Sequence, residues 1–194
     1  MVAAIASLMS IPSSLIQIAV YVFSSLALYT IAKRRGLTNP WLRWIPVANV
    51  WILGSIADQY RYVARGEIRN KRKVLLTLEI ISVVLVLLMV GFAISMVVGA
   101  ITGAIAGKPE DTVMRSILVS GSGLLAMLVP LLGVAIATAI IRYMALYDLY
   151  SSCDPDNKVI YLVIGILLGI TEPVFLFLCR NKDLGMPPRK DTAL

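Results

Sequence analysis

The sequence predicts an all-α integral membrane protein with four transmembrane helices and one further interfacial or re-entrant helix. The composition is the first observation, since 59% of the 194 residues are hydrophobic and 15% are charged, against roughly a quarter charged in soluble domains. The mean hydropathy is +0.85. Several apolar runs reach the roughly 20 residues that a helix needs to cross a bilayer. We therefore expect a single membrane domain, residues 1–194, with no soluble domain attached.

The first span is expected over residues 13–32. Pro12 stands just before it, and proline is tolerated at a helix start because its missing N–H would have no helical acceptor there. Lys33, Arg34 and Arg35 follow the last apolar residue directly. These charges mark the end of the span.

The segment 41–65 is apolar in its first half, yet it is flanked by positive charge on both sides. Residues 33–73 contain ten lysines or arginines and two acids. A spanning helix here would place basic flanks on opposite sides, which the positive-inside rule disfavours. We therefore expect loop 33–73 on the cytoplasmic side, with 41–65 either flat in the interface or dipping in and returning.

Five residues of this segment suit such a position. Aromatic rings concentrate at the headgroup level of membranes, and a proline can open a helix. The asparagine that follows is expected to hydrogen-bond backbone that the dip exposes. These interfacial residues are Trp41, Trp44, Trp51, Pro46 and Asn49.

The second and third spans are expected over residues 74–106 and 116–141. The second is 33 residues long and contains one charge, Glu79. Because this exceeds the thickness of the hydrocarbon layer, the helix must tilt or extend beyond it. The third contains Pro130, and Arg142 at its end is expected to snorkel to the cytoplasmic face.

The fourth span, 159–179, leaves two alternatives because Pro173 lies inside it. A full crossing puts the tail 181–194 outside, although the tail is basic. A turn at Pro173 instead returns the tail to the cytoplasm. We favour the full crossing, which places Cys153 and Cys179 at opposite faces, about 30 Å apart. They should then be unpaired, because a disulfide needs Cα atoms within about 7 Å.

Small residues recur every four positions in the second span, and a shorter pair occurs in the fourth. Small side chains at this spacing let another helix approach closely, which drives association where lipid supplies no hydrophobic force. Packing within the chain is the plainer interpretation, and an oligomer interface is the sharper one. The helix-packing residues are Gly91, Ser95, Gly99, Gly103, Gly107, Gly165 and Gly169.

Glu172 is the candidate functional residue, because an ionisable group inside a membrane span suggests a site by default. Pro173 frees the carbonyl of Gly169, and Thr171 adds a hydroxyl. With Thr138 at a similar level of the third span, these groups would form a proton or cation site. The structural alternative is a protonated Glu172 that hydrogen-bonds to a neighbouring helix.

Several function classes lose support. The chain has no histidine, the commonest metal ligand, and two cysteines do not make a disulfide framework. We find no nucleophile elbow and no phosphate-binding glycine loop, so we expect no cofactor, metal or catalytic residue. An enzyme using Lys or carboxylate as the base stays open. The positive charge flanks spans and lacks a recognition motif, which argues against nucleic acid.

One stretch carries a resemblance. "WLRWIPVANVWILGSIAD" contains the pattern Trp-x-x-Ile-Pro-x-x-Asn, and "LVPLLGVAIATAIIRYMALYDLY" repeats a proline-bearing apolar segment before Asp148-Leu149. Together they resemble an uncharacterised family of small bacterial multi-pass membrane proteins. The resemblance implies a bacterial inner-membrane location and supplies no activity.

Two functions follow as hypotheses. The first is a non-enzymatic membrane protein that acts through helix–helix contacts, as a homo-oligomer or an accessory subunit of a membrane complex. The second is a small transporter or channel with its site at Glu172. In both, the basic stretch from Arg61 to Lys73 is expected to contact anionic lipid headgroups.

Overall fold

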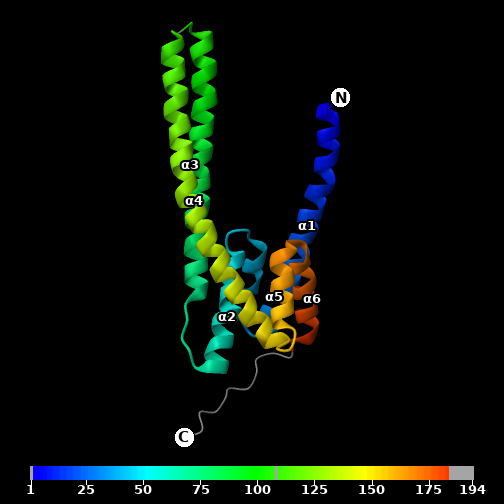
Figure 1. Ribbon diagram of the computed structural model, residues 1–194. Coiled ribbons are helices and arrows are strands. Elements are labelled where there is room, and N and C mark those ends of the chain that lie inside the picture. The colour runs from blue at the N-terminus through cyan, green and yellow to red at the C-terminus, as the bar shows by residue number, and fades with distance from the viewer. Residues whose placement is uncertain (1, 108, 184–194) are drawn as a thin grey trace. The chain divides into compact units, whose positions relative to one another are not determined.

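The structure, a computed structural model, describes residues 2–107 and 109–183, with side chains from residue 15 onward (Figure 1). Throughout these ranges the secondary structure is helical. The tail expected over 181–194 lies mostly outside the described residues. The all-α fold class is confirmed for the part of the chain that is described.

Three of the helices are long and apolar enough to cross a membrane. They are α1 (Val2–Arg34), α3 (Lys71–Ile105) and α4 (Glu110–Cys153), with the apolar part of α1 starting at Leu15. Helices α1 and α4 extend at both ends beyond the spans expected over 13–32 and 116–141, whereas α3 begins three residues before and ends one residue before the bounds expected at 74–106. Pro130 lies inside α4, which continues for another 23 residues to Cys153.

The chain divides into two compact units. One combines Met1–Leu76 with Ile141–Leu194, and we call it the basal unit. The other, Thr77–Ile140, is the hairpin unit, formed by the central parts of α3 and α4. The single domain expected from the sequence therefore consists of two separately compact parts.

In the hairpin unit, α3 and α4 run side by side (Figure 1). A Cβ added at Gly103 would lie 2.4 Å from a methyl group of Val113, and one at Gly99 would lie 3.3 Å from the hydroxyl of Ser116. Ser95 also contacts Ser120, with 3.3 Å between the hydroxyl oxygens. Small side chains therefore let the two helices approach, as expected where packing drives association.

The basal unit contains a segment that turns back along α1. After Gly36 and Asn39, both at positive φ, the chain forms the short 3-10 helix η1 (Pro40–Trp44) and then α2 (Asn49–Arg65). The Tyr21 hydroxyl donates to the Trp44 carbonyl at 2.8 Å. Tyr21 is thirteen residues before Arg34, or about 20 Å along the helix, so η1 lies well back from the end of α1.

The fourth span was expected as one helix over 159–179, and this is wrong. The residues form α5 (Lys158–Leu167), a 3-10 turn η2 (Gly169–Thr171) and α6 (Glu172–Lys182). With 10 and 11 residues, neither α5 nor α6 reaches the roughly 20 needed for a crossing. The helix breaks because Leu168 leaves helical geometry (φ −126°, ψ 77°) and because Pro173 cannot donate a helical hydrogen bond.

The two short helices form an antiparallel hairpin, seen as neighbouring orange and red helices in Figure 1. Tyr161 of α5 stacks on Phe175 of α6 with ring centroids 4.8 Å apart. At the open end of the hairpin, Lys182 forms an ion pair with Asp154. The turn near Pro173, the alternative left open by the sequence, matches this geometry.

The α5–α6 hairpin determines where the two cysteines lie. Their separation by about 30 Å is wrong, because Asp183 contacts both cysteines: its N–H donates to the Cys179 carbonyl at 2.8 Å, and its carboxylate accepts from the Cys153 thiol at 3.9 Å. Both are free thiols. The error came from the straight fourth span, which would have carried Cys179 to the opposite face.

The core of the basal unit joins the second half of α1 to α2, the end of α4 and α6. Its closest approach is at Gly54, where an added Cβ would lie 2.5 Å from the Cα of Arg72. Only a glycine allows α2 to lie so near the start of α3. The buried apolar residues are Ala27, Leu28, Ile31, Ala32, Val50, Ile52, Leu53, Ile56, Ala57, Leu75, Ala145, Leu146, Leu149, Tyr150, Leu176 and Cys179.

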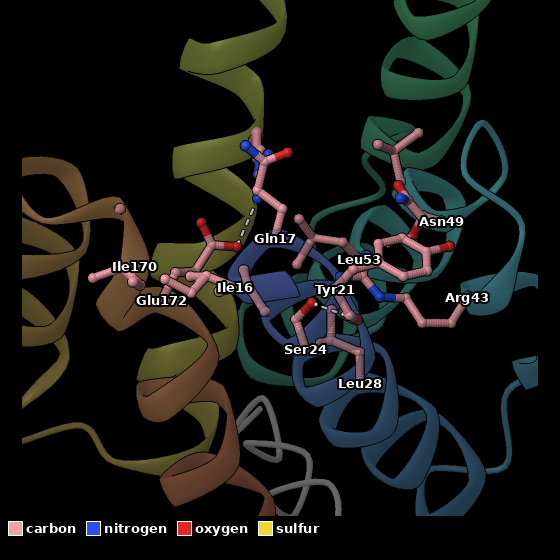
Figure 2. Close-up of a pocket in the computed structure, with 14 residues that line it drawn as sticks. Ile16, Gln17, Tyr21, Ser24, Leu28, Arg43, Asn49, Leu53, Ile170 and Glu172 are labelled. Carbon is pink, nitrogen blue, oxygen red and sulfur yellow. Dashed lines mark hydrogen bonds and ion pairs between the residues drawn. The ribbon is translucent and has the colours of Figure 1, made fainter. Parts of the chain in front are cut away.

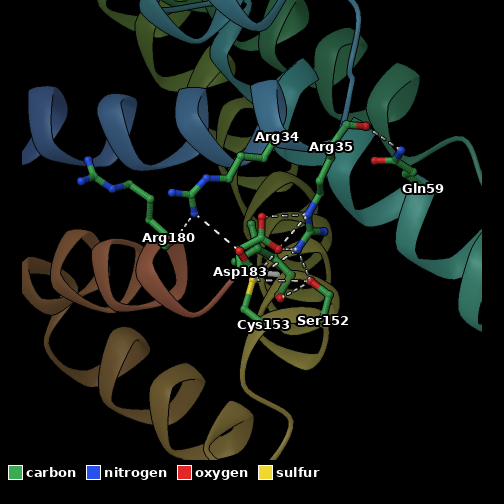
Figure 3. Close-up of polar contacts among 8 residues, drawn as sticks. Arg34, Arg35, Gln59, Ser152, Cys153, Arg180 and Asp183 are labelled. Carbon is green, nitrogen blue, oxygen red and sulfur yellow. Dashed lines mark hydrogen bonds and ion pairs between the residues drawn. The ribbon is translucent and has the colours of Figure 1, made fainter. Parts of the chain in front are cut away.

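Buried ion pairs close this unit at the end that carries the basic residues. Arg35 of the α1 end pairs with Asp183 after α6, at 2.6 Å, and both side chains are fully buried (Figure 3). Asp148 of α4 accepts from Arg61 at 2.8 Å and from Lys71 at 2.6 Å. These pairs tie the ends of α1, α2, α4 and α6 and the start of α3 to one another.

Candidate functional site

The basal unit contains a half-open cavity of about 490 Å³ lined by both polar and apolar residues, a size typical of small-molecule sites. Its wall comes from α1, η1, the first turns of α2, α4 at Arg142, and the junction of η2 with α6. The lining residues are Ile16, Gln17, Val20, Tyr21, Ser24, Leu28, Arg43, Asn49, Val50, Leu53, Arg142, Gly169, Ile170 and Glu172.

One face of α1 forms the central wall. Gln17, Tyr21, Ser24 and Leu28 are spaced by three or four residues, so they lie one above the other on the helix. In Figure 2, Tyr21 and Ser24 lie between Glu172 on one side of the view and Arg43 with Asn49 on the other. This stripe of polar side chains gives an otherwise apolar helix a hydrophilic patch.

Arg43 is the most constrained charge at the cavity. It lies in η1, where Asn39 and Pro40 set the chain direction, and only 7% of it is exposed. One guanidinium nitrogen donates to the Asn49 carbonyl at 3.4 Å, whereas the Nε hydrogen has no partner in the part of the chain that the structure describes. A buried donor without an acceptor is costly, and more so when it belongs to a charged group.

The second guanidinium, that of Arg142, forms an ion pair with Glu172 at 2.7 Å. Glu172 is the first residue of α6, where the helix dipole favours a negative charge. The sequence predicted that Arg142 would snorkel toward the cytoplasm, but the structure pairs it across α4 and α6. Arginine stays protonated in proteins, so two cations and one carboxylate leave the cavity with one net positive charge.

Two helices begin at this cavity. Asn49 is the first residue of α2 and Glu172 the first of α6, and both line it. Helix N-termini present unpaired N–H groups and the positive end of the dipole. Their direction adds to the positive potential that Arg43 and Arg142 create.

An apolar groove of about 400 Å³ adjoins the cavity between α1 and α6. Ile16, Val20 and Ile170 line both spaces, so the two adjoin. The groove is lined by Ile16, Ala19, Val20, Phe23, Ile170, Pro173, Val174 and Phe177. The polar residues of the cavity therefore lie next to an apolar groove.

The residues proposed as a proton or cation site are only partly brought together. Glu172 lines the cavity, and the Thr171 hydroxyl donates instead to the Leu168 carbonyl at 2.7 Å. Gly169 also lines the cavity. Thr138 donates to the Val134 carbonyl at 2.8 Å and belongs to the hairpin unit, so its distance from Glu172 is not defined.

The helix-packing residues divide into two groups. Ser95, Gly99 and Gly103 face α4 inside the hairpin. The others would meet no atom within 4 Å if a Cβ were added; they are Gly91, Gly107, Gly165 and Gly169. Packing within the chain thus uses the middle of the four-residue pattern.

The interfacial residues also differ in their surroundings. Trp41 and Trp44 are 54% and 40% exposed, whereas the Trp51 ring lies under the guanidinium of Arg72, 5.3 Å from it. Helix α2 begins at Asn49, three residues after Pro46. The Asn49 N–H donates to the Ile45 carbonyl at 2.8 Å, so Pro46 lies in the turn that leads into α2.

Sequence reasoning missed Arg43 and the polar face of α1. A signal was present, because Arg43 stands between Trp41 and Trp44 in a segment expected to dip into the membrane. A charge carried into such a segment needs a polar environment. Gln17, Tyr21 and Ser24, spaced on one face of the first span, supply it.

Comparisons with known proteins add no relative: no family model, curated protein or solved structure matches the chain.

Proposed function

We propose that the chain is a non-enzymatic multi-pass membrane protein that binds a small monoanion, or the anionic end of a larger molecule, in the basal cavity. The observation that carries this is the buried guanidinium of Arg43, which lines the cavity and whose Nε–H has no partner among the described residues. An anion would accept this hydrogen bond and neutralise the net positive charge. Hydrogen bonds between ionised groups are among the strongest in proteins.

The proposed topology has three spans, α1, α3 and α4, and two elements that enter the bilayer and return, η1–α2 and α5–α6. The buried pair of Arg35 with Asp183 supports this, because it joins the end of α6 to the basic end of α1. Residues 33–73 and the end of α6 then lie on the cytoplasmic side of a bacterial inner membrane. This arrangement keeps the basic residues of the chain's last part on the same side as the others.

Depth follows from this topology. Along α1, the cavity residues from Leu28 to Gln17 lie about 9–26 Å from Arg34. With Arg34 at the surface of a hydrocarbon layer about 30 Å thick, the cavity is centred near the middle of the membrane. Electrostatic attraction is strong there because water is scarce. Broken helices whose N-termini meet at mid-membrane are a known way of binding anionic groups.

A cation at Glu172 is the second candidate, and the geometry favours it less. Arg142 already occupies the carboxylate at 2.7 Å, and Arg43 lies near enough for its charge to interact with both. A second cation would be repelled by two guanidinium groups. Action through helix–helix contacts stays compatible with an anion site, and the open positions at Gly91 and Gly107 leave surface for a partner helix.

Contact of Arg61–Lys73 with anionic lipid remains part of the proposal. Arg61 and Lys71 are engaged with Asp148, and Arg69 pairs with Glu67. The exposed Lys73 and Arg65 are therefore the side chains best placed to meet headgroups. Such contacts would steady the cytoplasmic face without specifying a ligand.

The test is a calorimetric titration of the purified protein in detergent with sodium acetate at low ionic strength. We expect saturable binding in the wild type and in Arg115→Met, a matched variant at an exposed site of the hairpin unit. Arg43→Met should abolish binding. If Arg43→Met bound acetate as the wild type does, the proposal would be wrong.

Glu172→Gln separates the two candidate ligands. It removes the only carboxylate among the cavity residues, so acetate should bind more tightly if the site is for anions. If the site is for cations, the wild type should bind the cation of the added salt, and Glu172→Gln should lose this binding. Its unfolding temperature, measured in parallel, shows that the variant is folded.

A further inference from the structure

The cavity adjoins the apolar groove between α1 and α6. Ile16 and Val20 of α1 and Ile170 of η2 line both the cavity and the apolar groove. A molecule bound to Arg43 by its head therefore has an apolar groove beside it, between α1 and α6. A free inorganic anion would use the cavity and leave this groove unused.

From this adjacency we infer that the ligand is a single-chain anionic amphiphile of the fatty-acid class, with its carboxylate in the cavity and its acyl chain in the groove. This rests on the proposed anion site and names the class of its ligand. The charge supports a monoanion, because two guanidinium groups oppose one carboxylate. The chemistry of the groove supports an acyl chain, because its lining is aliphatic and aromatic throughout.

One chain, not two, fits the space. The groove of about 400 Å³ is a single space along one side of α1. It is bounded by Phe23 of α1 and Phe177 of α6, whose rings pack edge to face with centroids 5.7 Å apart. A diacyl lipid would have to leave its second chain outside.

The experiment measures binding of acetate, butyrate, hexanoate and octanoate to the full chain in detergent. Each methylene that enters the groove should tighten binding about fourfold, which corresponds to about 0.8 kcal/mol. Ala19→Phe fills the groove at an exposed position of α1 and should abolish this gain while acetate still binds. Ile18→Phe makes the same change at an exposed position outside the groove and should keep it.

Two results would overturn the inference and leave the anion site standing. One is that acetate binds and longer chains add no affinity. The other is that the gain persists in Ala19→Phe, which would place the chain elsewhere. If octanol bound as tightly as octanoate, the charged head would not be needed, and the inference would be wrong. If phosphatidylglycerol displaced octanoate at equal concentration, the site would not prefer a single chain, and the inference would again be wrong. If acetate itself failed to bind, the proposed anion site would fall, and the acyl-chain inference with it.

Discussion

Arg35 donates to both carboxylate oxygens of Asp183, at 2.6 and 3.5 Å, and neither side chain is exposed to solvent. The two residues lie at the ends of α1 and α6 (Figure 3). Arg35 also donates to the Ser152 hydroxyl at 2.8 Å and to the Cys153 sulfur at 3.3 Å. One guanidinium thus holds three chain segments at the basic end of the basal unit.

Asp183→Asn should destabilise the protein strongly, because it leaves the charge of Arg35 buried and uncompensated. Breaking such a pair from one side costs about 3–5 kcal/mol. The free energy of unfolding in mixed detergent measures this. Asp156→Asn, at an exposed position in the loop before α5, is the matched control and should be nearly neutral. An equal effect of both variants would show that the ion pair contributes little.

Accessibility to an impermeant thiol reagent tests the topology. Single cysteines at Thr38, Asn70 and Asn181, all exposed in the structure, should resist the reagent in intact cells once Cys153 and Cys179 are replaced. A cysteine at Glu110, between α3 and α4, should react. A fully crossing fourth span would instead make the cysteine at Asn181 react.

The native cysteines give an independent test of the α5–α6 hairpin. Because Cys153 and Cys179 both contact Asp183, they lie at the same end of the hairpin, and an added disulfide reagent should oxidise both to one intramolecular disulfide. Mass spectrometry of the digested protein detects the linked peptides. A straight fourth span would hold the two sulfurs about 30 Å apart, and no such product would form.

Gly103→Leu should lower the unfolding temperature in detergent. A Cβ at this position meets a methyl group of Val113 at 2.4 Å, and the larger side chain would force α3 and α4 apart. Overpacking of this kind costs about 1–3 kcal/mol. Gly91→Leu provides the comparison, since a Cβ there meets nothing within 4 Å. If Gly91→Leu alone were destabilising and dissociated an oligomer, the important contact would be with another chain.

The pair of Asp154 with Lys182 predicts an acid-sensitive step. The ion pair, together with hydrogen bonds from Asn157 and Tyr161, lowers the pKa of Asp154 from 3.8 to about 2. A lowered pKa means that the stabilisation is complete above about pH 4 and is lost as the pH falls toward 2. Asp154→Asn should remove this part of the pH dependence of unfolding. An unchanged profile would assign the acid sensitivity to other carboxylates.

Much of the fold was predictable, because three of the spans are long apolar runs bounded by charge. The prediction that residues 41–65 dip into the membrane followed from charge on both flanks, and it stays a prediction. The α5–α6 hairpin was harder, because residues 159–179 match a crossing helix in length and hydropathy. Two short helices and one long one bury similar residues, so periodicity does not separate them. The basic tail and Pro173 were the discriminating signals, and they were outweighed by length.

The site was predictable only around Glu172. Its partners Arg142 and Arg43 come from α4 and η1, and their convergence depends on how η1 turns back along α1. That turn is fixed by the hydrogen bond from Tyr21 to the Trp44 carbonyl, a contact between a side chain and a backbone group 23 residues apart. Sequence patterns describe faces of single helices, and they do not specify such contacts.

The buried ion pair of Arg35 with Asp183 also has a consequence for biosynthesis. Arg35 leaves the ribosome early, and Asp183 is among the last described residues to follow. Until then, the guanidinium lacks its carboxylate, and burying it would be costly. The end of α1 can therefore reach its final packing only when translation has passed α6. A nascent chain halted before Asp183 should remain open at this end and be a substrate for membrane proteases.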